Sequence, residues 1–223
     1  MKSDKISHKV SIPKYKDKNG RNLLTFTNQA ISTKELKNNY LKLSGCKNKI
    51  KVLHKDINQV KVIHKGDFIE VLIIYSVEEK AKLADNGNYV GIDLCVNNLA
   101  TIGGNSIKPF IINGRPLKSI NQYYNKKLAK LKSRQDLCKN KNVNKAKIRS
   151  LTSKRNNKIN DYLHKSSRLL VNQLVSNQVS KVVIGHNKEW KQDINIGKVN
   201  NQKFIQIPFN KFIQMVTYKC QLE

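Results

Sequence analysis

Residues 89–113 contain three short apolar segments in series, and the first of them carries an acid. Tyr89–Leu94 predicts a buried strand and Leu99–Ile102 a second one. Phe110–Ile112 predicts a third strand before a turn. Asp93 lies inside the first segment, where a carboxylate is costly to bury unless something binds it. The order therefore favours a sheet whose first strand offers Asp93 to a divalent metal, and the alternative is that Asp93 only anchors the turn after the strand.

A long helical stretch follows these strands. Its apolar residues recur at spacings of three and four along two stripes. These are Leu117, Ile120, Tyr124, Leu128 and Leu131 in the first stripe and Ile159, Tyr162, Leu163, Leu170 and Leu174 in the second. The polar residues 136–144 between the stripes predict the tip of a helical hairpin.

The helical stretch is also strongly basic. Residues 118–165 hold 15 Lys and Arg against two acids, Asp136 and Asp161. A run of charge is usually a solvated helical face, but an excess of one sign favours contact with a nucleic-acid backbone. The side chains predicted to contact phosphates are Lys126, Lys127, Lys130, Lys132, Arg134, Lys145, Lys147, Arg149, Lys154 and Arg155.

The whole chain shares this charge. Its 43 Lys and Arg against 15 Asp and Glu give a formal net charge of +28 over 223 residues. Nucleic acid is the partner that such an excess favours, because neutralising phosphates releases condensed counterions. An anionic membrane surface is the lesser alternative, since no Lys-rich amphipathic helix with a Trp or Phe face is present to bind one.

Nothing in the sequence predicts export or membrane insertion. The N-terminus lacks the apolar core of a signal peptide, and Glu70 interrupts the longest apolar run, Phe68–Val77. Four cysteines, at positions 46, 95, 138 and 220, are scattered without paired spacing, as in free thiols of a cytosolic protein. We therefore predict a cytoplasmic protein.

The remaining segments predict two domains. Ile57–His64 and Phe68–Val77 read as a hairpin, which indicates a small antiparallel β-domain over residues 1–84. The turn-forming residues 85–88 separate it from a second domain over residues 88–223. That domain is completed by a strand at Lys181–Gly185 and by a helix from Pro208, whose apolar face is Phe209, Phe212, Met215 and Val216.

Four segments together resemble the TnpB (OrfB) family of insertion-sequence proteins, relatives of type V CRISPR effectors. They are Arg21–Gln29, Gly91–Leu94 with Asn98–Thr101, Asn125–Leu131 and Asp161–Ser167. The resemblance covers nearly the whole chain. It implies an α/β fold: a ribonuclease-H-like (RuvC-like) domain with a basic helical hairpin inserted at about 116–176, preceded by a wedge-like or barrel-like β-domain.

The resemblance also implies a function. Members of the TnpB (OrfB) family are RNA-guided DNA endonucleases, in which a guide RNA from the transposon end pairs with target DNA. Three carboxylates would hold divalent metals, of which Mg²⁺ is the expected one, and Asp93 matches the first carboxylate. DNA and guide RNA are thus the expected partners, with no membrane and no indication of oligomeric state.

The chain departs from the family pattern in ways that put cleavage in doubt. Where most members place a second acid, this chain has Ile184-Gly185-His186-Asn187. Glu189 and Asp193 are local substitutes, although each reads more simply as a loop acid, and His186 as a structural histidine. The third acid and the family's zinc module are not found, and both ends look clipped, so we expect an incomplete, inactive nuclease domain.

Two alternatives remain open. One is a nucleic-acid-binding remnant without catalysis, left by transposon decay. The other is an RNA-binding, ribosome-associated protein, which the charge alone would fit. A buried acid in Gly91–Leu94 argues against the ribosomal protein, because a scaffold has no need of one.

Overall fold

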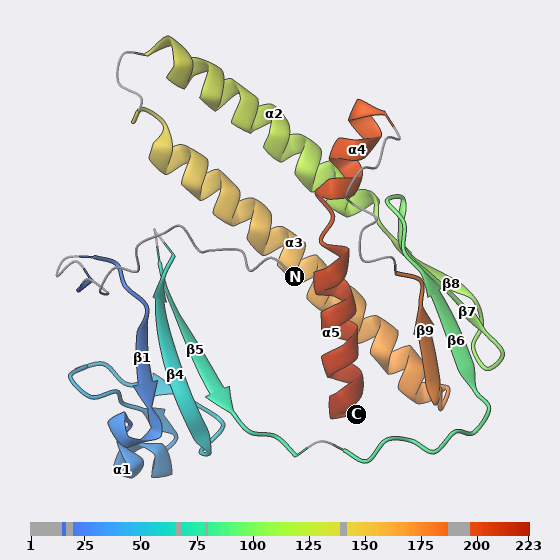
Figure 1. Ribbon diagram of the computed structural model, residues 1–223, viewed down its shortest axis with the longest axis horizontal. Coiled ribbons are helices and arrows are strands. Elements are labelled where there is room, and N and C mark those ends of the chain that lie inside the picture. The colour runs from blue at the N-terminus through green and yellow to red at the C-terminus, as the bar shows by residue number, and fades with distance from the viewer. Residues whose placement is uncertain (1–14, 17–19, 66–67, 79, 139–141, 187–196) are drawn as a thin grey trace, which may run out of the picture. The chain divides into compact units, whose positions relative to one another are not determined.

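The computed structural model describes residues 15–16, 20–65, 68–78, 80–138, 142–186 and 197–223. The chain divides into two compact units, residues 1–77 and 78–223. Figure 1 shows the strands of the first unit in blue to cyan, and the sheet and long helices of the second in green to red.

The first unit is built on antiparallel strands. β1 (Leu24–Thr27), β4 (Ile57–His64) and β5 (Ile69–Tyr75) form a sheet in the order β1-β4-β5. The short strands β2 (Tyr40–Leu41) and β3 (Ile50–Lys51) form a second pair. The β4–β5 register, which pairs Val62 with Val71, confirms the predicted hairpin. Residues 66–67 of its predicted turn lie outside the described residues.

Two short helical segments and a small core complete this unit. The 3-10 helix η1 covers Asn28–Ala30, and α1 covers Thr33–Lys37. The side chain of Ser32 caps α1 by accepting a hydrogen bond from the backbone N–H of Glu35 at 3.5 Å. The buried core consists of Ile31, Leu41, Leu43, Val52, Ile57 and Val60.

The second unit contains a four-stranded mixed sheet. Its strands are β6 (Tyr89–Asp93), β7 (Asn98–Gly104), β8 (Phe110–Asn113) and β9 (Lys181–Ile184). The order is β8-β7-β6-β9, with β6, β7 and β8 antiparallel and β9 parallel to β6. The three predicted strands in series are therefore present, and the strand predicted near residue 181 joins them at the edge next to β6.

Among the described residues, four helices accompany the sheet: α2 (Arg115–Leu137), α3 (Lys145–Ser176), α4 (Lys198–Ile205) and α5 (Phe209–Leu222). α2 and α3 run side by side as a long hairpin, and α5 lies along the sheet-proximal half of α3 (Figure 1). α2 is helical to Leu137, so the tip is shorter than the predicted 136–144. α4 was not predicted, because its residues show no clear apolar stripe.

One apolar core joins the sheet to the helices. Val90 and Ile92 of β6 point into it, as do Leu163 and Leu170 of α3. The predicted apolar face of α5 is buried here as well: Phe209, Phe212, Met215 and Val216. Because the core covers one face of the sheet, alternate residues of β6 point to the other face.

Gly114 allows the turn from β8 into α2 to close tightly. A Cβ at this buried position would lie 2.4 Å from the backbone oxygen of Val96 and 3.0 Å from that of Asn97. Its own N–H donates to the Asn97 oxygen at 2.7 Å. Only glycine fits between these backbone groups, so Gly114 fixes where the hairpin leaves the sheet.

Candidate nucleic-acid interface and the acid on strand β6

Asp93 is the last residue of β6, and its side chain is exposed. The burial of β6 alternates, with Val90 and Ile92 inside and Tyr89, Gly91 and Asp93 outside. The expectation of a buried acid was therefore wrong. An apolar flanking sequence does not bury a residue whose place in the strand alternation points it away from the core. An exposed Asp93 therefore does not exclude a ribosome-associated protein.

β6 and β9 end next to each other, so Asp93 lies beside the start of the segment after β9. Gly185 donates a backbone hydrogen bond to the oxygen of Ile92 at 2.9 Å. His186, the next residue, has its Nε2 2.8 Å from Oδ1 of Asn210, in the first turn of α5. This corner of the sheet thus brings together the ends of two strands and the start of a helix. His186 is held by a structural contact, in line with its simpler interpretation.

The described residues do not form a metal site around Asp93. Within the described part of the chain, no three His, Cys, Asp or Glu side chains are grouped so that they could hold a metal ion. The local substitutes Glu189 and Asp193 lie outside the described residues. A two-metal site needs several oxygen ligands, so the described residues alone do not fit one. The role of Asp93 as a metal ligand stays a prediction.

The predicted phosphate-contacting residues gather on the α2–α3 hairpin, and most of them are exposed. Those exposed are Lys126, Lys127, Lys130, Lys132 and Arg134 on α2 and Lys145, Lys147, Arg149 and Lys154 on α3. Their ammonium and guanidinium groups come from both arms of the hairpin. In the described part of these helices the acids are Asp136 and Asp161, and Asp161 is bound to Lys165 at 2.8 Å. The hairpin therefore presents a strongly cationic surface.

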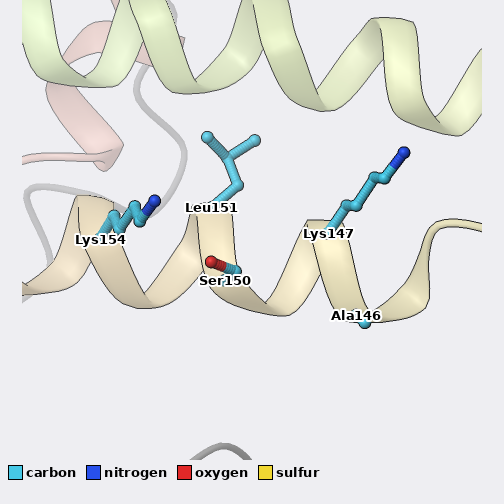
Figure 2. A pocket seen from close by; sticks show the side chains of 5 residues that line it. All are labelled: Ala146, Lys147, Ser150, Leu151 and Lys154. Atoms are coloured by element: carbon cyan, nitrogen blue, oxygen red, sulfur yellow. The ribbon is translucent and has the colours of Figure 1, made fainter.

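Figure 2 shows one part of this surface on α3. A shallow hollow of about 410 Å³ is lined by Ala146, Lys147, Ser150, Leu151 and Lys154. Lys147 and Lys154 point to the same side as Leu151, which extends toward α2, and they flank it at a separation of two helical turns. Two ammonium groups and a hydroxyl around an open hollow are donors suited to the oxygens of a phosphate backbone.

Arg155 differs from the other predicted contacts, because its guanidinium is engaged inside the protein. It donates to Oδ1 of Asn121 at 2.9 Å, to Oδ1 of Asn156 at 3.0 Å and to the backbone oxygen of Gln206 at 3.2 Å. Its carbon Cζ also lies 5.6 Å from the ring centroid of Tyr124. Burial lowers the pKa of this guanidinium below its ordinary value. These contacts give Arg155 a structural role between the helices.

The predicted contacts did not include every exposed cation of the described helices. Lys158 is exposed on α3, four residues after Lys154, so it continues the line of Lys147 and Lys154 along the helix. This spacing was visible in the sequence and could have identified it. Lys118, at the base of α2, is instead bonded through Nζ to Oδ1 of Asn97 at 2.6 Å.

Residues 72–191 match the family model OrfB_IS605, whose description is "Probable transposase". A comparison with curated proteins finds no match. Two solved structures are similar to the chain, at 15% and 14% identity: "Cryo-EM structure of the Cas12f1-sgRNA-target DNA complex" and "Cryo-EM structure of CRISPR-Cas12f Ternary Complex". The TM-scores are 0.43 and 0.46, over 73% and 74% of this chain. The chain spans 39% and 34% of the lengths of those two proteins.

No helix among the described residues is long and apolar enough to cross a bilayer.

Proposed function

The chain belongs to the TnpB (OrfB) family of probable transposases, and we propose that it binds nucleic acid along the basic hairpin formed by α2 and α3. The observation that carries this proposal is the exposure of nine predicted cations on two adjacent helices. A surface with this excess of one charge repels itself unless anions lie against it. The polymeric anion that fits a long cationic hairpin is a phosphate backbone, whether of DNA or of a guide RNA.

Beyond nucleic-acid binding, we propose that the chain has the function of the family's RNA-guided DNA endonucleases and that its second unit is ribonuclease-H-like. The order β8-β7-β6-β9 supports this, because it places Asp93 on a central strand beside the parallel strand β9. Mg²⁺, when bound at such a site, would supply charge to the attacking and leaving oxygens of a phosphodiester. Asp93 is the one ligand that we assign, and the described residues alone do not account for a cleavage step.

A binding experiment tests the hairpin. The double charge reversal Lys126→Glu/Lys130→Glu should weaken binding to a 20-base-pair duplex by at least about tenfold at low salt. The affinity falls because two phosphate contacts are lost and two carboxylates now repel the phosphates. The double change Lys82→Glu with Lys108→Glu is the control, because it alters the same total charge at exposed positions of the same unit outside the hairpin. Equal losses in both variants would show that net charge, and not the hairpin, governs binding.

A cleavage experiment tests the role of Asp93. The chain is incubated with Mg²⁺, guide RNA and target DNA, and Asp93→Ala is compared with the unaltered protein. Because Asp93 is exposed, the substitution leaves the core intact. A product that disappears in Asp93→Ala supports the endonuclease. A protein that binds nucleic acid but yields no Asp93-dependent product is the non-catalytic binding module.

A further inference from the structure

Two neighbouring tyrosines on α2 have opposite environments. Tyr124 is half-buried, its hydroxyl lies 3.2 Å from Oγ1 of Thr152, and Arg155 lies over its ring. These contacts explain Tyr124 as a packing residue between α2 and α3. Tyr123 is 60% exposed, so its ring contributes little to that packing.

Lysines lie on the face of α2 that carries the exposed ring of Tyr123. Nζ of Lys127 lies 5.7 Å from its ring centroid. Lys126 and Lys130 follow at three and seven residues along the same helix, and both are exposed. Tyr123 is thus an exposed aromatic ring with one ammonium beside it and further lysines on the same helical face, on the hairpin that we propose as the nucleic-acid interface.

We propose that Tyr123 is a stacking platform for an unpaired base of a single-stranded nucleic acid. The phosphates on either side of that base would lie against Lys126, Lys127 and Lys130. Every base has a π-face, so stacking on an aromatic ring tolerates any sequence, and the cations track the backbone. A base within a duplex is already stacked on its neighbours and cannot use the ring. This inference rests on the proposed function of the hairpin and adds a preference for single strands to it.

The test compares three ligands on the full chain at one salt concentration: a single-stranded 12-mer of RNA, the same sequence as DNA, and a 12-base-pair duplex. Tyr123→Ala should weaken binding to the single strands by at least about fivefold, the lower end of what a lost base–aromatic stack costs. It should change binding to the duplex less than about twofold. Tyr123→Phe keeps the ring and should bind like the unaltered protein. The RNA and DNA arms show which kind of single strand the ring prefers.

Tyr218→Ala is the matched control. Tyr218 is also an exposed tyrosine with a lysine near its ring, at 6.0 Å, but it lies on α5 outside the hairpin. A direct readout comes from Tyr123→Trp in a chain whose one tryptophan is removed by Trp190→Phe. The emission of the new indole should be quenched by single strands and not by the duplex.

The outcomes separate the two proposals. Equal weakening of single-strand and duplex binding in Tyr123→Ala, or no weakening of either, overturns the stacking role while leaving the hairpin as a binding surface. Weakening in Tyr218→Ala as large as in Tyr123→Ala also overturns it. If the unaltered chain binds none of the three ligands, the proposed function fails, and the stacking role fails with it.

Discussion

Arg155 shows how a basic residue within a cationic run can serve the fold and not the surface. Two of its three hydrogen bonds connect α3 with Asn121 of α2 and with Gln206, the capping residue just after α4. Asn125 and Gln206 add a reciprocal pair of amide hydrogen bonds at 3.0 and 2.9 Å. From composition alone Arg155 could not be told from Lys154, because the difference lies in partners that are distant in sequence.

Replacing Arg155 should therefore cost stability. We expect Arg155→Ala to lower the free energy of unfolding by about 1.5 to 3 kcal/mol, since hydrogen bonds from a charged group are lost and the buried Asn121 loses a partner. Urea denaturation measures this. Lys154→Ala, at an exposed neighbouring position, should stay within about 0.5 kcal/mol of the unaltered protein. A stable Arg155→Ala that has instead lost its affinity for DNA would restore Arg155 as a phosphate contact.

Lys219 gives a prediction about pH. It is only 4% exposed on α5, and its Nζ donates to the backbone oxygen of His164 at 2.8 Å and to Oγ of Ser167 at 2.7 Å. Burial lowers the pKa of its ammonium below 10.5, and repulsion from Arg168 is a second, smaller cause of this shift. Between the lowered folded-state pKa and 10.5 the unfolded chain holds more protons, so stability rises with pH across that window.

We therefore expect the free energy of unfolding of the unaltered protein, minus that of Lys219→Met, to increase as the pH rises from 8 toward 10.5. Taking the difference cancels the self-repulsion that both proteins share. Thermal unfolding at several pH values measures it. A difference that shrinks with rising pH would mean that the ammonium is better stabilised in the folded state than in the unfolded chain.

Among the secondary-structure elements, the turn from β8 into α2 depends on one glycine. A Cβ at Gly114 meets the backbone oxygen of Val96 at 2.4 Å, whereas a Cβ at Gly103 of β7 meets nothing within 4 Å. We expect Gly114→Ala to destabilise the chain by about 1 to 3 kcal/mol, because backbone must shift to admit the methyl group. Gly103→Ala should be close to neutral, and chemical denaturation of the two variants compares them. Equal effects of the two substitutions would show that the backbone around Gly114 can move away from the added methyl group without loss of stability.

The elements that the sequence predicts well are those with a strong apolar period. β4, the strands β6, β7 and β8, and the buried face of α5 all follow from alternation or from spacings of three and four. α1 is five residues long, and α4 shows no clear apolar stripe; local pattern predicted neither. The burial of Asp93 was predicted wrongly for a different reason: its neighbours are apolar, but alternation along β6 places its side chain on the face of the sheet opposite the core.

Over the whole molecule, the net charge is the property that the sequence predicts most directly. The fold determines which of the charged side chains are exposed. The formal net charge of +28 is visible in the composition. Only the folded hairpin shows that nine of the ten cations predicted to contact phosphates are exposed on α2 and α3, whereas Arg155 is engaged inside. The residues that would complete a metal site around Asp93 could not be predicted in the same way, because carboxylates that share a metal come from separate segments.

The salt dependence of DNA binding tests the central claim most directly. The affinity of the full chain for a 20-base-pair duplex is measured between 50 and 300 mM salt, and the slope of log affinity against log salt is compared with that of Lys126→Ala/Lys130→Ala. We expect the magnitude of the slope to fall by about two in this variant, close to one for each lost phosphate contact, and to be unchanged in Lys82→Ala/Lys108→Ala. Equal slopes in all three proteins would contradict a nucleic-acid interface on the α2–α3 hairpin.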